Sequence, residues 1–194
     1  DYSMANCPHQ ATLEFHIRRI RDDGASGYVA RELRLGDRVK VEGPYGGAWL
    51  RKDHTGPILA IAGGSGLAPI KSIVETALVA ATTQDIHLYF GVRDEPDIYL
   101  EEHFRALALR YPNLRFVPVL SDPSGPTGRR TGIVSDAAAA DFADFDGFNA
   151  YLAGPPAMVE ATVAMLARRG LRREDIHADP FYTEAEKAAR GMTP

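Results

Sequence analysis

The chain has 194 residues, of which 45% are hydrophobic and 25% charged, a composition typical of a globular protein with a sizeable core. Its net charge of −4 gives no electrostatic support for nucleic-acid binding, and no apolar run approaches the ~20 residues of a membrane helix. The single cysteine, Cys7, excludes an internal disulfide and an iron–sulfur cluster held by this chain's own thiolates, and it is typical of a cytoplasmic protein. None of the six histidines has a metal-ligand spacing, so no metal site is predicted.

Residues 1–55 show the two-residue period of antiparallel strands with one wet face. Apolar and polar side chains alternate over residues 13–17 and again over 39–42. A short helical piece at 28–33 lies between them, and residues 43–47 form a glycine- and proline-rich turn. Two or three strands cannot close a barrel, so we expect the carboxyl-terminal part of an antiparallel β-barrel whose other strands precede Asp1.

From Ile58 onward, apolar β-prone runs alternate with helical patterns. The runs cover residues 58–62, 86–91, 114–120, 149–153 and about 175–178. Helices are predicted between them at 67–81, 99–110 and 157–168, with a short alanine-rich helix at 137–140. This order predicts an α/β domain over residues 56–194 with a five-stranded parallel sheet. Residues 121–131 are predicted to be a loop after the third strand, and the charged tail 183–194 is expected to be mobile.

The glycine corner at residues 63–69, GGSGLAP, lies between the first apolar run and the first helix. Pro69 stands where the dinucleotide fingerprint needs its last glycine, and Ile70 stands where a P-loop needs one before Lys71. Leu67 likewise replaces the final glycine of a nucleophile elbow. Two interpretations remain: a tight turn without a ligand, or a turn whose free N–H groups bind a pyrophosphate.

Seven segments, taken in order, resemble the ferredoxin–NADP reductase superfamily, and most closely the reductase components of ring-hydroxylating dioxygenases of the naphthalene dioxygenase type. They are YSMA (2–5), EFHIR (14–18), HTGP (54–57), GGSGLAP (63–69), YFGVR (89–93), AGPPAMVEA (153–161) and HADPFY (177–182). The family's first motif begins with an arginine, which would stand just before Asp1. The family's last nucleotide motif begins with cysteine, where this chain has Ala153.

The resemblance implies that residues 1–55 belong to an FAD-binding domain. Tyr2 would pack along the flavin, and the Ser3 hydroxyl would lie near the reactive flavin nitrogen N5. The amides at the start of the short helix would bind phosphate oxygens, which favours FAD over FMN. The implied flavin-side residues are Tyr2, Ser3, Ala5, Asn6, His16, Ile17, Arg18, Gly24, Ala25 and Ser26.

The resemblance also implies that residues 56–194 form an NAD(P)-binding domain. Asp122 would repel the 2′-phosphate of NADPH, whereas Arg129 and Arg130 would attract it; we expect NADH as the donor, with NADPH possible. Phe181, or alternatively Tyr182, would cover the flavin face that the nicotinamide approaches. The implied nicotinamide-side residues are Gly64, Ser65, Gly66, Pro69, Arg93, Asp122, Ala153, Gly154, Pro155, Met158 and Phe181.

The implied function is an FAD-dependent ferredoxin–NAD(P)+ reductase, with Ser3 and Phe181 as the catalytic residues. Electrons would pass from NADH through FAD to a [2Fe–2S] ferredoxin. That ferredoxin would be an upstream domain or a separate protein, and it would feed a Rieske-type, aromatic-ring-hydroxylating dioxygenase of aromatic hydrocarbon catabolism. Two alternatives remain: a reductase with another acceptor, as in flavohaemoglobins, or a flavin-free nucleotide-binding regulatory module.

Overall fold

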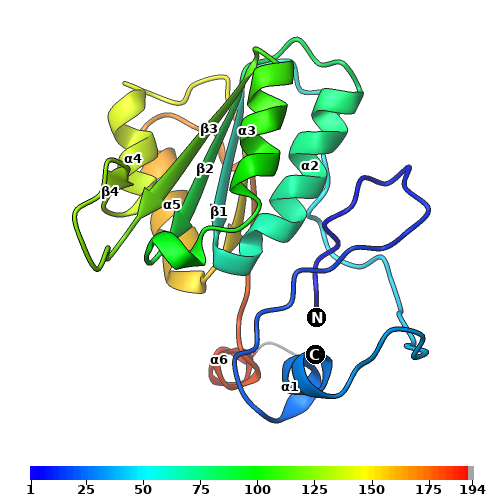
Figure 1. Ribbon diagram of the computed structural model, residues 1–194. Coiled ribbons are helices and arrows are strands. Elements are labelled where there is room, and N and C mark those ends of the chain that lie inside the picture. The colour runs from blue at the N-terminus through cyan, green and yellow to red at the C-terminus, as the bar shows by residue number, and fades with distance from the viewer. Residues whose placement is uncertain (192–194) are drawn as a thin grey trace.

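The computed structural model describes residues 1–191 and divides into an α/β part above and an amino-terminal segment, residues 1–55, below it (Figure 1). The α/β part contains one sheet of six parallel strands in the order β4-β3-β2-β1-β5-β6. The strands are β1 Ile58–Gly63, β2 Ile86–Val92, β3 Leu114–Leu120, β4 Arg130–Thr131, β5 Asn149–Gly154 and β6 Ile176–Pro180.

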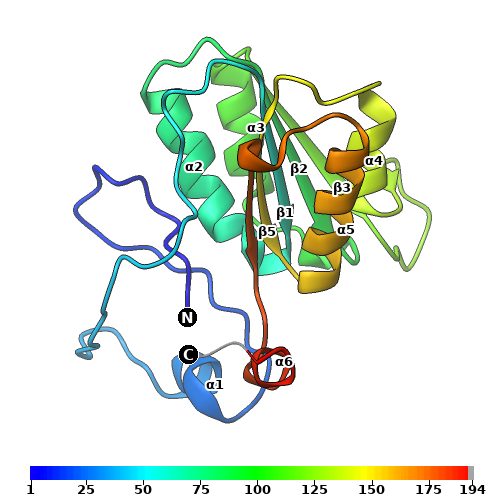
Figure 2. The ribbon, with the colours of Figure 1, turned by 180° about the vertical axis from the view of Figure 1, so that it is seen from behind.

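Helices cover both faces of this sheet, α2 and α3 on one side and α4 and α5 on the other (Figures 1 and 2). The helices are α1 Gly24–Arg31, α2 Leu67–Val79, α3 Glu101–Arg110, α4 Val134–Asp141, α5 Pro156–Arg168 and α6 Glu184–Ala189. Short 3-10 turns are η1 Gly64–Gly66, η2 Glu95–Asp97 and η3 Arg173–Asp175.

Strand β1 lies at the centre of the sheet and is buried along its whole length. Its residues alternate between the two layers: Ile58 and Ala60 pack with α2 and α3, whereas Leu59 and Ile61 pack with α4 and α5. This two-sided burial explains why the sequence of β1 is an unbroken apolar run instead of an alternating one. The chain continues from β1 to β2 on one side and returns at β5 on the other, so the sheet reverses its order between β1 and β5.

The five predicted strands are confirmed, and each agrees with the structure to within about two residues. The sixth strand, β4, lies in the segment that was predicted to be a loop. It pairs Arg130 with Val119 and Thr131 with Leu120 at the end of β3. A segment of two residues is too short to show a hydrophobic periodicity, so β4 is recognisable as a strand through its pairing with β3.

Within the charged tail, residues 184–189 form the helix α6, and residues 192–194 of that tail lie outside the described residues. Thr183 caps this helix by accepting a hydrogen bond from the Glu186 N–H, while the Glu186 side chain accepts from the Thr183 N–H. This reciprocal capping box satisfies two helix-end donors, which is why a short polar segment becomes helical.

The amino-terminal segment contains α1 but not the two expected strands at residues 13–17 and 39–42. Its strand-like contact is one antiparallel bridge between Met4 and Phe15, beside a hydrogen bond from Ala5 N to Glu14 O of 2.8 Å. A β-strand needs a neighbouring strand to satisfy its backbone hydrogen bonds. Within residues 1–191, segment 39–42 has no strand beside it. Its apolar side chains, Val39 and Val41, are therefore exposed.

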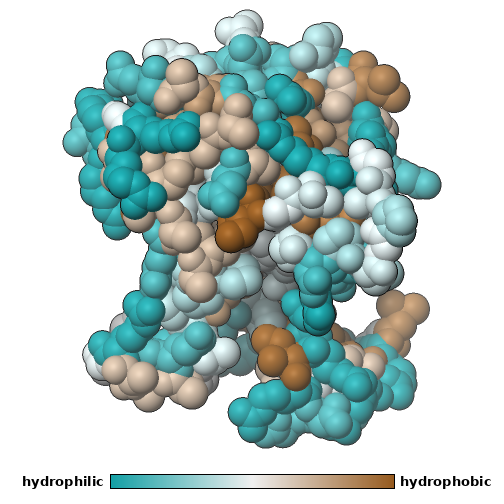
Figure 3. Space-filling view, turned by 90° about the vertical axis from the view of Figure 1, so that its left-hand side faces the viewer, coloured by the Kyte–Doolittle hydropathy of each residue, from teal (hydrophilic) through white to brown (hydrophobic). Residues whose placement is uncertain are grey.

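None of the helices within residues 1–191 is both long enough and apolar enough to span a membrane. The space-filling view shows the large α/β body above and two narrower arms below it, with the surface hollowed between the arms (Figure 3).

Strand β2 carries a half-buried histidine, His87, that should make the fold sensitive to acid. His87 packs edge-on to Phe142 at 4.8 Å between ring centroids, and its buried Nδ1 has no hydrogen-bond partner among residues 1–191. Burial lowers the pKa of His87 below its ordinary 6.5; Arg115 adds to this shift, and Asp85 and Asp141 oppose it. The unfolded chain therefore binds a proton more readily than the folded chain.

We expect the free energy of unfolding to fall as the pH drops below about 6.5, through the range in which unfolded His87 gains its proton. His87→Leu should flatten this dependence, by about 1.4 kcal/mol for each pKa unit that separates the folded and unfolded states. Urea unfolding at pH 5.5 and 7.5 measures the effect, with His9→Gln at an exposed histidine as the control. An equal pH dependence in wild type and His87→Leu would contradict the expectation.

Candidate functional site

The candidate site lies where the carboxyl ends of β1 and β5 meet, at the point where the sheet reverses its order. Such switch points form a crevice in open parallel sheets. Two glycines allow the ends to approach. A Cβ built on Gly154, whose φ is +140°, would lie 2.7 Å from the Gly63 carbonyl oxygen. A Cβ on Gly63 would lie 2.6 Å from the Met158 sulfur and 2.8 Å from Pro155 Cδ.

The predicted GGSGLAP and AGPP motifs are thus brought into direct contact. Gly66 of η1 packs so closely against β5 that a Cβ on it would lie 2.2 Å from the Ala153 carbonyl oxygen. Pro69 lies in the first turn of α2, where its missing N–H has no helical partner to lose. Ala153, at the position of the family's cysteine, is buried within β5 and contributes packing without a thiol.

A cavity of about 760 Å³ opens at this crevice and is lined by both parts of the chain. The exposed Arg18 reaches over the glycine corner: its Nη1 is the nearest atom, at 4.0 Å, to a Cβ built on Gly64. Gly64 itself has φ +53°, a left-handed conformation that L side chains rarely adopt. A guanidinium facing a glycine turn is a donor arrangement suited to an anionic diphosphate. The site residues predicted from the sequence that line this cavity are His16, Ile17, Arg18, Gly64, Ser65, Arg93, Pro155 and Met158.

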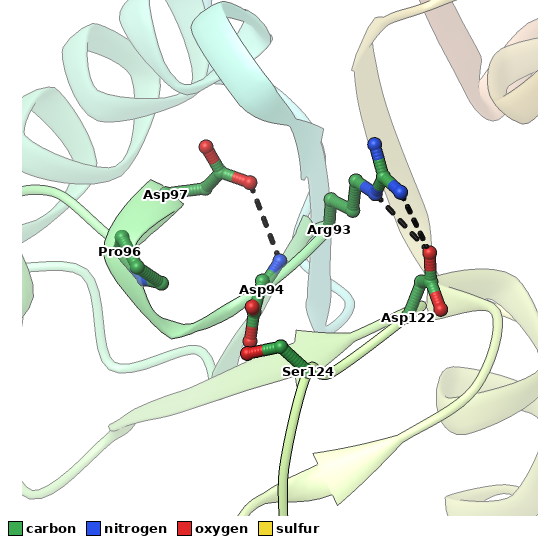
Figure 4. A pocket seen from close by; sticks show the side chains of 6 residues that line it. All are labelled: Arg93, Asp94, Pro96, Asp97, Asp122 and Ser124. Carbon is green, nitrogen blue, oxygen red and sulfur yellow. Dashed lines mark hydrogen bonds and ion pairs between the residues drawn. The ribbon is translucent and has the colours of Figure 1, made fainter.

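A second hollow of about 430 Å³ adjoins the first beyond β2 and contains the predicted residues Arg93 and Asp122 (Figure 4). These two side chains contact each other: Arg93 donates to Asp122 Oδ2 from Nε at 3.2 Å and from Nη2 at 3.0 Å. Both are exposed. Asp94 and Asp97 lie opposite, and the hydrogen bond from Ser124 holds the pKa of Asp94 below its usual range. The hollow therefore contains three carboxylates and one guanidinium.

The two arginines that could favour a phosphorylated nucleotide are both held by carboxylates. Arg129 donates to the two oxygens of Glu101 at 2.6 and 2.9 Å, and to Glu95 at 2.6 Å. Arg130 donates to Asp141 at 2.7 Å. Their charges are neutralised within the fold.

On the flavin side, the structure brings Ser3 together with Asp179, a residue that the sequence analysis did not select. The Ser3 hydroxyl donates to Asp179 Oδ2 at 3.2 Å. Burial raises the pKa of Asp179, although the bond from Ser3 opposes the shift. Phe181 follows closely and is anchored by its N–H, which donates to the Gly154 carbonyl at 2.9 Å. Asp179 lies inside the HADPFY motif, and this position was the one sequence feature that could have marked it as a site residue.

The other predicted flavin residues lie in three different settings. Tyr2 is exposed, whereas Ala5 and Asn6 are buried against α2, where Ser72 donates to the Asn6 carbonyl at 2.7 Å. Gly24 starts α1 with φ +77°, followed by Ala25 and Ser26. In the described part of the chain no side chain caps the amino end of this helix, so its first amide donors are available to an anion. α1 lies in the lower part of the molecule, away from the sheet (Figures 1 and 2).

Comparison with known proteins agrees with this geometry. Residues 60–164 match the family model described as the oxidoreductase NAD-binding domain. The chain is 50% identical over 182 residues to the ferredoxin–NAD(P)(+) reductase component of the naphthalene 1,2-dioxygenase/salicylate 5-hydroxylase systems of Ralstonia sp.. It is 42% identical over 181 residues to the corresponding naphthalene 1,2-dioxygenase component of Pseudomonas putida. Each alignment covers 93% of this chain and 55% of the relative, so the chain spans about half the length of these proteins.

Solved structures show the same relationship. The cytochrome P450 reductase GcoB of Amycolatopsis superposes with a TM-score of 0.82 at 36% identity, covering 93% of this chain and 60% of that one. The ferredoxin reductase in carbazole 1,9a-dioxygenase superposes with a TM-score of 0.76 at 27% identity, covering 93% and 55%. The chain therefore belongs to the oxidoreductase NAD-binding domain family, within the ferredoxin–NADP reductase superfamily, and is of the dioxygenase-reductase type.

Proposed function

We propose that this chain is the FAD- and NAD(P)-binding part of a ferredoxin–NAD(P)+ reductase. Residues 1–55 would be the carboxyl-terminal part of the flavin-binding domain, and residues 56–194 the nicotinamide-binding domain. Bound FAD would accept an electron pair from NADH and release electrons singly. The acceptor would be a [2Fe–2S] ferredoxin domain or a separate ferredoxin that supplies an aromatic-ring-hydroxylating dioxygenase. The lone thiol and the NADH requirement are consistent with a cytoplasmic reaction.

The observation that carries the proposal is the cavity shared by the two parts of the chain. Its α/β side provides the glycine corner at Gly64 and Ser65, and its amino-terminal side provides His16, Ile17 and Arg18. A dinucleotide held on the α/β side would therefore face the segment proposed to hold the flavin. Arg18 would bind a diphosphate from across the cavity, because its guanidinium is exposed and lies beside Gly64.

The residues around Ser3 also fit a flavin. Asp179 accepts the Ser3 hydrogen, so the serine's oxygen lone pairs are oriented away from the carboxylate. Phe181 is half-buried beside the core and is held through its backbone, which leaves its ring able to cover an aromatic cofactor. In this assignment, Ser3 positions the reacting groups and Phe181 excludes water from them.

The charges of the second hollow favour NADH over NADPH. A 2′-phosphate near Asp122 would meet a carboxylate, and Arg129 and Arg130 are already paired. Asp122→Ser should remove this repulsion and also release Arg93 to bind a phosphate. We expect the ratio of kcat/KM for NADH to that for NADPH to fall about tenfold, since close like charges cost roughly 1 kcal/mol or more. Steady-state kinetics with both donors measures the ratio.

The matched control is Asp53→Ser, which removes an exposed carboxylate outside both hollows. This change should leave the donor ratio unaltered. The assignment of Asp122 is wrong if Asp122→Ser changes kcat/KM for NADH and kcat/KM for NADPH by the same factor.

The function is tested by purifying the protein with added FAD and recording its visible absorbance before and after anaerobic NADH. We expect a yellow protein that NADH bleaches and that then reduces a plant-type [2Fe–2S] ferredoxin. A colourless protein that still binds NADH would instead indicate a flavin-free nucleotide-binding module. A protein that is bleached but reduces no ferredoxin would indicate a different acceptor, as in flavohaemoglobins.

A further inference from the structure

Helix α2 carries a lysine that is almost completely buried. Lys71 is 5% exposed, although its side chain ends in an ammonium group. Its Nζ lies 2.9 Å from Glu14 Oε2, 3.3 Å from Glu75 Oε2 and 3.2 Å from the Ala5 carbonyl oxygen. Lysine is rarely buried to this extent unless it is paired, so the site is specialised for a charged group.

One side of this cluster leads to the nucleotide cavity. The second carboxylate oxygen of Glu14 lies 2.8 Å from His16 Nε2, and His16 Nδ1 lies 3.0 Å from the Tyr99 hydroxyl. The His16 and Tyr99 rings meet edge-on at 5.2 Å. The Tyr99 hydroxyl oxygen also lies 3.4 Å from the Gly64 carbonyl oxygen, and both rings line the cavity. Lys71 is thus connected to the cavity wall through Glu14.

On its other side, Lys71 contacts a second carboxylate, Glu75, within the α/β part. Glu75, one helical turn further along α2, binds Lys71 through Oε2 and His103 Nε2 through Oε1, the latter at 2.5 Å. Burial alone would lower the pKa of Lys71, but the hydrogen bonds and charges of Glu14 and Glu75 outweigh it and raise the pKa. The ammonium is therefore retained, and it balances one of the two carboxylate charges.

The backbone next to Tyr99 has an unusual conformation. Leu100 has φ 56° and ψ 22°, a left-handed conformation that a non-glycine residue rarely adopts. Such residues persist where the surrounding contacts fix them, and they are frequent at functional sites. Leu100 itself packs against the core under α2 and α3. The placement of Tyr99 is therefore determined both by its backbone and by His16.

We propose that Lys71 is a positioning residue for the nucleotide cavity: through Glu14 it holds the His16 imidazole against Tyr99, so that both parts of the chain form one fixed wall beside Gly64. The amino-terminal segment provides Glu14 and His16, and the α/β part provides Lys71 and Tyr99. Only the identity of the ligand, NADH, rests on the proposed function.

The test compares wild type with Lys71→Met, which keeps the side-chain length without the charge, and with Lys71→Arg, which keeps the charge. The direct readout is the ¹⁵N NMR signature of the His16 ring in the full chain without nucleotide. Wild type should show one fixed tautomer with its proton on Nε2, facing the Glu14 carboxylate. Lys71→Met should lose this fixed signature, and Lys71→Arg should keep it.

The second readout is the dissociation constant for NADH, which should rise roughly tenfold in Lys71→Met, as expected for one lost hydrogen bond to a charged group. Lys52→Met, at an exposed lysine, is the control and should change neither readout. If Lys71→Met does not fold, Glu14→Gln serves instead, because Glu14 is only half-buried, and the same two changes are expected.

A purely structural role would lower the melting temperature and leave the His16 signature and the NADH affinity unchanged, and this result would overturn the proposal. Failure of the wild-type protein to bind NADH is a different outcome. It would contradict the proposed function, whereas the His16 signature would still decide the role of Lys71.

Discussion

Gly66→Ala is expected to destabilise the α/β part by about 3 kcal/mol or more, which is the upper range for overpacking a well-packed site. The added Cβ would lie 2.2 Å from the Ala153 carbonyl oxygen and 2.7 Å from Gly154 Cα. These are backbone atoms of β5, which is paired on one side with β1 and on the other with β6. The strand cannot move away without breaking one of these pairings, so the clash is not relieved. Urea unfolding followed by circular dichroism measures the loss.

Two other glycines provide controls for this prediction. Gly125 has no heavy atom within 4 Å of its added Cβ, so Gly125→Ala should be close to neutral. Gly64→Asn should keep the fold, because Asn tolerates the left-handed φ of +53° and the space beside Gly64 is open except for Arg18. Its side chain would enter the cavity and should weaken NADH binding. Equal destabilisation by all three substitutions would show that close contact with β5 is not the reason.

The sheet was predictable because its strands are buried on both faces and therefore read as continuous apolar runs. The β3 bounds, Leu114–Leu120, were predicted without error, and β1 and β2 extend one residue further than predicted. The two-residue β4 depends on its partner β3 and left no trace in the sequence. By contrast, α6 had a readable signal, since Thr183 and Glu186 have the spacing of a capping box.

The site was predictable to the extent that motifs lie at strand ends, which meet at one edge of a parallel sheet. That rule brought Gly64 and Pro155 together. It could not show which side chains pair across the fold. Ser3 and Asp179 are 176 residues apart, and the contact between Lys71 and Glu14 joins the two parts of the chain. Such pairings depend on tertiary packing, which neither periodicity nor spacing records.

The pairing of Ser3 with Asp179 leads to the largest expected change in activity. Ser3→Ala should slow the reduction of bound FAD by NADH about 100-fold, within the range typical for removing one positioned hydrogen-bonding group from a reacting centre. The hydroxyl donates to Asp179 Oδ2 at 3.2 Å, so the carboxylate fixes the direction in which the serine oxygen points. Stopped-flow absorbance under anaerobic NADH measures the rate.

Two further variants separate the hydroxyl from the packing of the side chain. Ser3→Thr keeps the donor and should retain most of the rate, whereas Asp179→Asn keeps the size of the carboxyl group and should lose part of it. Thr83→Ala removes an exposed hydroxyl between α2 and β2 and should have no effect. A Ser3→Ala rate close to that of wild type would remove Ser3 from the reaction. The amino-terminal segment would then contribute to the site through His16, Ile17 and Arg18, because these residues line the cavity independently of Ser3.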